Sequence, residues 1–357
     1  MNNRVFTKLL MQWHKNDNKR QMPWKGEKDP YKVWLSEIIL QQTRVEQGLA
    51  YYEKFISKFP TIELLAKAKD ETVFKLWEGL GYYSRCKNVL LTARLIVKNL
   101  KGKFPSDYET ILSLKGVGPY TAAAIASFCF NLPYAVVDGN VFRVLSRVSA
   151  KDTAIDTNEG KKFFTALAGE LLDKKNPGAF NQAIMDFGAT VCKPMLPLCS
   201  TCALQKICGA YKAGRVDALP VKEKRLIKKT RWFTYFVFEY DKKLLVNKRT
   251  ANDIWQNLHE FYSVETEENP AWDLDKAKKW CSNLRIKYTN EIKIIAAQPQ
   301  QLTHQTIKGF FIKIHLQSIP HFLKSGEMKW KTISSLQKIG FPKFITQYLK
   351  ALSAKGF

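Results

Sequence analysis

The sequence predicts a mainly α-helical domain, followed by a linker and a smaller α+β domain. Through about residue 210, apolar residues recur at helical spacing, and short breakers such as "KGKFPSD" and "KKNPGA" separate the helices. The charged stretch "GRVDALPVKEKRLIKKT" has little periodicity and is typical of an interdomain linker. Beyond it, "RWFTYFVFEY", "KLLVNKR" and "FFIKIHL" are β-branched and aromatic runs, which favour strands. We therefore expect domains over residues 1–215 and 231–357, with a linker over 216–230.

The stretch "PYKVWLSEIILQQTRV" shows why the first domain is expected to be helical. Its apolar residues stand at i, i+3, i+4, i+7 and i+8, which forms one stripe on a helix, and Pro30 suits the start of that helix. "YYSRCKNVLLTARLIVKNL" and "NEGKKFFTALAGELLD" have the same character. The stripe consists of Tyr31, Trp34, Leu35, Ile38 and Ile39.

The charge balance indicates a polyanionic partner. The 357 residues include 57 Lys and Arg against 32 Asp and Glu, which gives a net charge of +25 and a pI near 9.7. Nucleic acid and an anionic membrane surface both fit such a charge, but no isolated basic amphipathic helix favours the membrane. There is no apolar run of signal-peptide length and no uncharged stretch that could span a bilayer. We therefore expect a nucleic-acid partner, no membrane, and a cytoplasmic, nucleoid-associated protein.

Four of the seven cysteines are concentrated in "CKPMLPLCSTCALQKIC", with six, two and five residues between them. Disulfides are disfavoured in a reducing cytosol. Four thiolates can hold either zinc or an iron–sulfur cluster, and the spacing alone leaves both open. The other three, Cys86, Cys129 and Cys281, stand apart as ordinary core-type thiols.

A glycine-rich turn in "LSLKGVGPYTAAAIASF" is a candidate phosphate-binding site. Gly116 and Gly118 allow a tight turn, and Pro119 suits the first turn of the following helix. Such a turn directs backbone N–H groups at an anion, assisted by the helix dipole. Together with the preceding "DYETILSL", it resembles a helix-hairpin-helix motif that binds the DNA backbone, over about residues 106–129.

Two acidic residues are candidates for chemistry. Asp138 in "AVVDGNVFRVL" follows an apolar run and opens a helix, so it is expected to be an N-cap, which is compatible with facing a developing cation. Glu37 lies beside the apolar stripe of its helix, and a solvated side chain is the default interpretation. If Glu37 is instead buried near Trp and Tyr side chains, its pKa rises and it becomes a usable general acid. Such a pair would suit cleavage of a glycosidic bond.

Three stretches in one order resemble the MutY family of adenine DNA glycosylases, within the endonuclease III superfamily. They are "PYKVWLSEIILQQTRV", "GVGPYTAAAI" with "VVDGNV", and "FNQAIMDFGATVC" with the three cysteines that follow. The resemblance covers nearly all of 1–215. After the linker, "NKRTANDIWQNLHEF" and "LTHQTIKGFFIKIHL" resemble the family's C-terminal domain, which is similar to Nudix hydrolases and implies lesion recognition.

The resemblance implies the cofactor and the site. It implies a 4Fe-4S cluster on the loop 192–208, which would carry Lys193 and Lys206 towards DNA. It implies that Glu37 protonates a flipped-out adenine, because the bond cannot be reached within the duplex. The cluster ligands would be Cys192, Cys199, Cys202 and Cys208; the other catalytic-site residues Asp138, which faces the cationic sugar, with Tyr120 and Asn140; and the DNA-contacting residues Trp24, Gln42, Thr43, Leu80, Tyr82, Gly116, Gly118 and Gln182.

The sequence departs from the family's patterns at three places. Bifunctional relatives have a lysine where this chain has Tyr120, and some adenine glycosylases have one where it has Phe142, so strand cleavage is expected to be weak or absent. "EFYSVETEENPAWD" lacks the metal-binding run of active Nudix enzymes, so the second domain is expected to recognise rather than hydrolyse. The family's Phe-Ser-His turn, which reads 8-oxoguanine, is here Leu302, Thr303 and His304.

The resulting expectation is a monomeric, monofunctional glycosylase that removes adenine opposite 8-oxoguanine or guanine in double-stranded DNA. The main alternative is a pyrimidine-lesion glycosylase with lyase activity, which the absence of a lysine at Tyr120 and the C-terminal domain both oppose. A mismatch thymine glycosylase would lack that domain. A non-catalytic DNA-binding scaffold would tolerate loss of Glu37, and a Nudix-type nucleotide hydrolase would need the missing metal-binding run.

Overall fold

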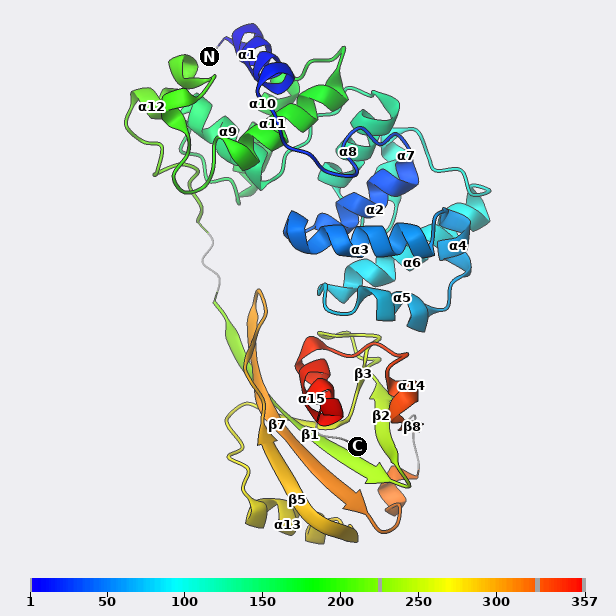
Figure 1. Ribbon diagram of the computed structural model, residues 1–357. Helices are drawn as coiled ribbons and strands as arrows, with labels where there is room; N and C mark the ends of the chain where they lie inside the picture. The colour runs from blue at the N-terminus through cyan, green and yellow to red at the C-terminus, as the bar shows by residue number, and fades with distance from the viewer. Residues whose placement is uncertain (1, 224–226, 325–327, 355–357) are drawn as a thin grey trace. The chain divides into compact units, whose positions relative to one another are not determined.

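The computed structural model describes residues 2–223, 227–324 and 328–354, and it divides into two compact units. Unit 1 comprises Met1–Ala66 and Leu91–Arg225, and unit 2 comprises Lys67–Leu90 and Leu226–Phe357. Figure 1 shows that helices dominate the first part of the chain and that the sheet belongs to the second. The predicted fold class, a helical domain joined to a smaller domain with a sheet, is confirmed. None of the described helices is long and apolar enough to cross a membrane.

Unit 1 is built around two layers of helices that surround a continuous core. Helices α1, α8, α9, α10 and α11 contribute the buried side chains of this core, among them Phe6, Phe164 and Phe180. The helices that lie wholly in this unit are α1 (Asn3–Asn16), α2 (Pro30–Leu40), α3 (Val45–Lys58), α7 (Tyr108–Ser113), α8 (Pro119–Phe130), α9 (Gly139–Ser149), α10 (Asn158–Leu171), α11 (Pro177–Thr190) and α12 (Gly209–Lys212), with short 3-10 turns at Cys199–Thr201 and Gln205–Ile207.

Helix α2 is buried on nearly every side. It starts where expected, with Asp29 as N-cap and Pro30 in the first turn, and every residue from Val33 to Ile39 is buried. It packs against α3 and α8. The helix ends at Leu40, and Gln41–Arg44 form the connection to α3, so the expected helical stretch is divided in two. Because every residue from Val33 to Ile39 is buried, a polar residue within this stretch must be accommodated inside the protein.

The helix-hairpin-helix motif consists of α7, a tight turn and α8. Asp107 caps α7 by accepting a hydrogen bond from the backbone N–H of Thr110. Gly116 has φ +79°, a left-handed conformation that glycine adopts without strain. Gly118 is the N-cap of α8, and Pro119 occupies its first position. The turn therefore presents its backbone at the start of a helix, as the sequence predicts.

Unit 2 contains a mixed sheet with the strand order β3-β2-β1-β7-β5. The two long central strands, β1 and β7, are parallel, whereas the other pairs are antiparallel; β4 also pairs with β1, β6 with β7, and β8 with β2. The strands are β1 (Lys229–Tyr240), β2 (Lys243–Lys248), β3 (His259–Glu260), β4 (Tyr262–Thr266), β5 (Tyr288–Ala296), β6 (Gln300–Gln301), β7 (Gln305–Leu316) and β8 (Lys329–Thr332).

Helices cover both faces of this sheet (Figure 1). On one face, Ala277 and Cys281 of α13 pack with Phe236 of β1 and Ile312 of β7. On the other face, aromatic rings of α15 stack on those of the alternate strand positions, as Tyr348 does on Phe311. The helices of this unit are α5 (Asp70–Trp77), α13 (Leu274–Asn283), α14 (Ile333–Leu336) and α15 (Lys343–Ala354), while α4 (Ile62–Lys67) and α6 (Tyr83–Asn99) belong partly to each unit.

The segment expected to be a linker is partly ordered against unit 1. The backbone N–H of Ile155 donates to the carbonyl of Val221, and that of Glu223 donates to the carboxylate of Asp156. Residues 224–226 of the expected linker lie outside the described residues, and β1 already begins at Lys229. Residues 216–223 are therefore held by side-chain and backbone contacts rather than freely solvated.

Gly309 provides a test of the sheet. It lies opposite Phe233 in the parallel β1–β7 pair, and a Cβ atom at this position would stand 1.9 Å from the Phe233 carbonyl oxygen. Gly309→Ala should therefore destabilise the protein by about 1–3 kcal/mol, as overpacking does. As a matched control, Gly169→Ala in α10 meets nothing within 4 Å and should stabilise by about 0.5–1 kcal/mol. Urea unfolding would measure both, and equal stabilities would contradict the strand register.

Candidate active site

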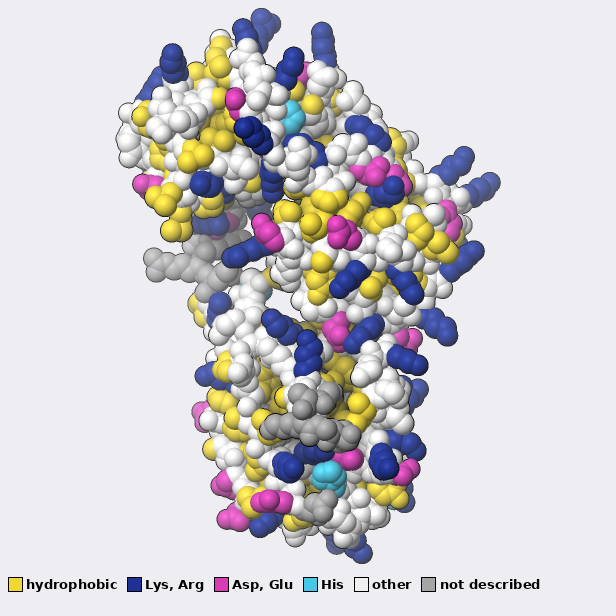
Figure 2. All heavy atoms as spheres, in the orientation of Figure 1, with side chains coloured by type: hydrophobic (Ala, Val, Ile, Leu, Met, Phe, Trp, Pro, Cys, Tyr) yellow, Lys and Arg dark blue, Asp and Glu magenta, His cyan; other side chains and the backbone are white. Residues whose placement is uncertain are grey.

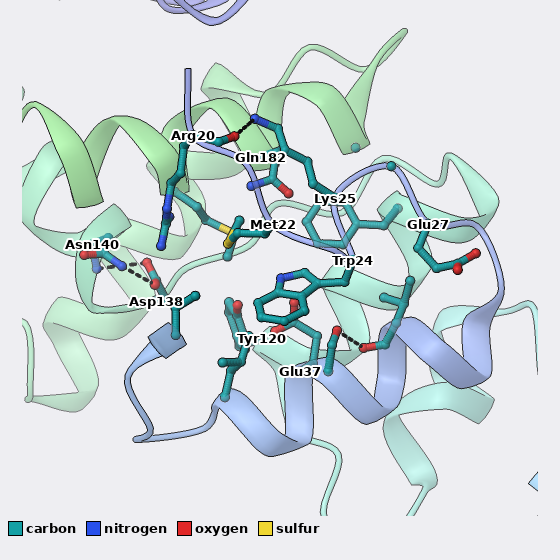
Figure 3. A pocket seen from close by; sticks show the side chains of 18 of the residues that line it. Arg20, Met22, Trp24, Lys25, Glu27, Glu37, Tyr120, Asp138, Asn140 and Gln182 are labelled. Carbon is teal, nitrogen blue, oxygen red and sulfur yellow. Dashed lines mark hydrogen bonds between the residues drawn. The ribbon is translucent and has the colours of Figure 1, made fainter. Parts of the chain in front are cut away.

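A cavity of about 740 Å³ in unit 1 brings together residues from distant parts of the chain. Helices α2, α8, α9 and α11 and the segment before α2 contribute its walls, and Figure 3 shows their side chains converging on one space. Eight of the residues singled out from the sequence line it: Trp24, Glu37, Gln42, Thr43, Tyr120, Asp138, Asn140 and Gln182.

Glu37 is a buried carboxyl group rather than a solvated one. Only 7 % of the residue is exposed. Burial raises the pKa of Glu37, a hydrogen bond with Tyr120 opposes this effect, and the negative charge of Asp138 adds to it, so that the pKa is about 7. At neutral pH the carboxyl is therefore divided between its protonated and ionised forms, which is the condition for a general acid.

Asp138 is held rigidly at the start of α9. Its Oδ1 atom accepts hydrogen bonds from the backbone N–H groups of Asn140 (2.9 Å) and Val141 (2.8 Å), which confirms the predicted N-cap. Its Oδ2 atom accepts from the Asn140 side-chain amide at 2.8 Å, and both residues lie at one edge of the cavity in Figure 3. Three donors on one carboxylate fix its orientation.

Asn140 is in turn oriented by Arg143. The Arg143 guanidinium donates to the Asn140 side-chain oxygen (2.9 Å), to the Gly188 carbonyl (2.7 Å) and to the Cys192 carbonyl (2.7 Å). Gly188 of α11 is needed here, because a Cβ atom would stand 2.7 Å from the Asn140 Cβ. The start of α9 is therefore locked to the end of α11 and to the first cysteine of the loop.

Trp24 and Gln182 also line the cavity (Figure 3). Trp24 is buried and packs edge-on against Tyr52, with 5.4 Å between the ring centroids. Gln182 donates to Asp186 at 3.0 Å, one turn further along α11.

Sequence reasoning missed several residues of this site. His14, Arg20, Met22 and Lys25 line the cavity, and Asp186 lies fully buried behind Gln182. His14 lies in the last turn of α1, whereas Arg20, Met22 and Lys25 come from the segment between α1 and α2, which has no periodicity and gives no local signal. Asp186 did have a local sequence signal. It is an acidic residue inside the apolar helical stretch "AFNQAIMDFGA", four residues after Gln182, a candidate base-contacting residue.

The remaining candidates lie elsewhere. Gly116 and Gly118 form the hairpin turn and do not line the cavity. In unit 2, a separate cavity of about 410 Å³ is lined by the turn Leu302, Thr303 and His304 and by Leu80 and Tyr82. The Tyr82 and Thr303 hydroxyl groups are hydrogen-bonded to each other. The 302–304 turn connects β6 to β7, as the sequence predicts.

The four clustered cysteines share one small apolar pocket. Cys192, Cys199, Cys202 and Cys208 all line it, each is half-buried, and none forms a disulfide. Arg147 of α9 donates to the Cys192 sulfur (3.5 Å) and to the Lys193 carbonyl (2.7 Å), which holds the loop in place. No three His, Cys, Asp or Glu residues of the described chain are grouped closely enough to hold a single metal ion. Four thiols facing one apolar space nevertheless have the donor chemistry that an iron–sulfur cluster requires.

The fold and the paired carboxyl groups define a helix-hairpin-helix glycosylase of base excision repair. The profile described as "HhH-GPD superfamily base excision DNA repair protein" matches residues 35–168, and a NUDIX domain profile matches residues 234–351. The chain is 32 % identical to the adenine DNA glycosylase of Buchnera aphidicola subsp. Schizaphis graminum, over 97 % of this chain and 98 % of that protein. It belongs to the adenine DNA glycosylase family, whose members are hydrolases of N-glycosidic bonds.

Further relatives and solved structures are similar to this chain in sequence or in fold. The adenine DNA glycosylase of Rattus norvegicus is 43 % identical over 60 % of this chain and 44 % of its own length. A thermostable thymine-DNA glycosylase structure matches with a TM-score of 0.55 and 30 % identity, covering 59 % of this chain and 97 % of that one. An endonuclease III–DNA complex matches with a TM-score of 0.52 at 19 % identity, covering 60 % of this chain and 98 % of that one, which shows the shared fold.

The environment of Glu37 can be measured directly. Infrared difference spectroscopy of protein with ¹³C-labelled glutamate, compared with Glu37→Gln, should show a carboxyl that titrates with a pKa of about 7. Tyr120→Phe removes the hydrogen bond that lowers this pKa, so the midpoint should move to higher pH. Tyr31→Phe is the matched control. Tyr31 lies on the same helix as Glu37, but its hydroxyl donates to the Phe59 carbonyl and not to Glu37. A midpoint near the ordinary value for Glu would contradict the burial.

Proposed function

We propose that this chain is a monofunctional enzyme that removes adenine paired with 8-oxoguanine or guanine from double-stranded DNA. The observation that carries the proposal is the placement of Glu37 and Asp138 in one cavity, with different environments. Glu37 has a pKa raised to about 7 by burial, whereas Asp138 is surrounded by hydrogen-bond donors. Two carboxyl groups in such different environments can divide the roles of acid and charge stabiliser.

The chemistry follows from this division. The Glu37 carboxyl gives its proton to a ring nitrogen of the flipped-out adenine, and the electron pair of the glycosidic bond then leaves with the neutral base. The sugar becomes an oxocarbenium ion, which the carboxylate of Asp138 stabilises. Water adds to the sugar carbon and its proton returns to the ionised Glu37. The products are free adenine and an abasic site.

Tyr120 and Asn140 act as positioning residues in this proposal. Tyr120 hydrogen-bonds to Glu37, and Asn140 hydrogen-bonds to Asp138. Phe142 packs edge-on against Phe164 in the core of unit 1. Neither Tyr120 nor Phe142 carries an amine that could form a Schiff base. Lys25 does line the cavity, but its ammonium group is held by the Arg20 carbonyl and Asp186. This arrangement supports hydrolysis without strand cleavage.

Binding of duplex DNA is supported by charge and by the hairpin, and we propose that the chain binds it as a monomer. Figure 2 shows Lys and Arg side chains projecting over the visible surface of both units, in keeping with the net charge of +25. The turn at Gly116 and Gly118 leads into α8, whose N-terminus suits a phosphate group. The relatives with solved structures include endonuclease III bound to DNA. A chromosomal substrate would place the enzyme at the nucleoid.

A 4Fe-4S cluster held by Cys192, Cys199, Cys202 and Cys208 is part of the proposal. The shared apolar pocket and the four thiols support it. The bound cluster would supply structural cross-linking of the loop rather than a step of the hydrolysis. The chain's own contribution is made by Arg147 and Arg143, which hold the loop carbonyls and connect them to Asn140.

The C-terminal domain, over 231–357, is proposed to recognise the base opposite adenine. Thr303 and His304 are exposed in the turn between β6 and β7. 8-oxoguanine differs from guanine by an added oxygen and an added ring N–H, so a hydroxyl and an imidazole can distinguish them. Leu302 is half-buried and replaces the aromatic residue of the family pattern.

Base removal should depend on the proton of Glu37. With a duplex carrying adenine opposite 8-oxoguanine, single-turnover excision should fall as the pH rises above about 7, because Glu37 loses its proton there. Glu37→Gln should lose at least about a thousandfold in rate, since the amide cannot act as the acid. Glu46→Gln, an exposed glutamate on α3, is the matched control and should stay fully active. Substantial excision by Glu37→Gln would exclude Glu37 as the acid.

The purified protein should contain roughly four irons per chain and absorb broadly in the visible range, as four-thiolate clusters do. Cys199→Ser should lose iron and soluble yield, because one ligand of the cluster is gone. Cys129→Ser, a half-buried cysteine of unit 1 outside the loop, should keep its iron. Stoichiometric zinc without iron after anaerobic purification would overturn the cluster assignment.

Selectivity for the opposite base should depend on the turn between β6 and β7. Mutating Thr303 and His304 together to Ala should reduce the preference for 8-oxoguanine over guanine by about 1–3 kcal/mol, the usual value of a specific base contact. Thr306→Ala is the matched control, because its hydroxyl donates to Gln301 at 2.9 Å in the same hairpin. Rates on both duplexes give the preference directly, and an unchanged preference in the double variant would remove this turn as the reader.

A further inference from the structure

Asp186 is the most heavily bonded buried carboxylate beside the cavity. It is fully buried in α11. Its Oδ1 atom accepts from Gln182 Nε2 (3.0 Å) and Arg20 Nη1 (2.9 Å), and its Oδ2 atom accepts from Asn18 Nδ2 (2.9 Å) and lies 3.2 Å from Lys25 Nζ. All four partners are donors and two of them are cations, so both oxygens of Asp186 serve as acceptors.

This carboxylate determines which way the Gln182 amide points. A side-chain amide has a donating nitrogen and an accepting oxygen, and only the nitrogen can face an ionised carboxylate. The alternative orientation would put the Gln182 oxygen against Asp186 Oδ1, where both atoms are acceptors. The Gln182 oxygen is therefore directed away from Asp186, and the residue lines the cavity that Trp24 also lines (Figure 3).

We propose that Asp186 is a specificity-determining residue, which selects a purine with an amino group at C6 by presenting the Gln182 oxygen to it. Adenine carries this donor, whereas a 6-oxopurine presents an acceptor at the same place and is repelled. The proposal rests on the proposed function and adds to it the polarity by which the cavity reads its base. Asp186 acts through Gln182 and does not itself line the cavity.

The network also has a structural effect that the test must separate. Asn18, Arg20 and Lys25 belong to the segment that contains Trp24, so Asp186 attaches this segment to α11. Loss of that attachment would slow the removal of every base. Loss of the amide orientation would change the choice between bases, and only when Gln182 is present.

The experiment compares three target bases in otherwise identical duplexes: adenine, hypoxanthine as the 6-oxopurine, and unsubstituted purine, which has no group at C6. Single-turnover excision rates of Asp186→Asn are divided by those of the wild-type chain for each base, which cancels the intrinsic reactivity of the base. The adenine ratio should fall about ten- to a hundredfold below the hypoxanthine and purine ratios, the size expected for one specific polar contact. The asparagine amide can donate to the Gln182 oxygen and so permits the opposite orientation.

A double-mutant cycle with Gln182→Leu isolates the route of the effect. In the Gln182→Leu background, Asp186→Asn should no longer change the adenine-to-hypoxanthine ratio. Uniform slowing of all three bases by Asp186→Asn, or an equal change in the Gln182→Leu background, would overturn the inference and leave the proposed function standing. If Asp186→Asn does not fold, Gln182→Leu alone must abolish the preference for adenine, and retention of that preference overturns the inference. A wild-type chain that removes none of the three bases would overturn the proposed function, and the inference with it.

Discussion

The burial of the Glu37 carboxyl is the constraint on which unit 1 depends. Holding it protonated near neutral pH requires burial, and α2 supplies it because every residue from Val33 to Ile39 is buried and the helix packs against α3 and α8. Ionising this group costs about 3 kcal/mol more than ionising an exposed glutamate, judged from a pKa of about 7. The surrounding core, the hydrogen bond from Tyr120 and the nearby Asp138 all set that value. A looser core would let water in and return Glu37 to an ordinary carboxylate.

Local signals were sufficient for the residues whose roles are local. The N-cap at Asp138, the tight turn at Gly116 and the start of α2 at Pro30 each follow from a few adjacent residues, and the structure agrees with them. The burial of Glu37 could not be decided in this way, because the apolar stripe of α2 left it at the edge. Only the packing of α2 against α3 and α8 shows that Glu37 is buried.

Long-range arrangements account for what the sequence could not show. The strands of unit 2 were visible as β-branched runs, but the parallel pairing of β1 with β7 joins segments more than seventy residues apart. The inclusion of Lys67–Leu90 in unit 2 is equally invisible, since these residues read as ordinary helices. The Asp186 network has the same origin: its donors come from a segment without periodicity and meet only after α1 and α11 have packed together.

The backbone N–H groups that cap α9 use only one oxygen of Asp138, so the capping can be separated from the negative charge of the carboxylate. Both backbone N–H groups are received by Oδ1, and an asparagine keeps such an oxygen. Asp138→Asn therefore preserves the helix while removing the charge, and most other replacements damage both. A chain with this substitution would therefore fold as before and differ by a single charge at the edge of the cavity.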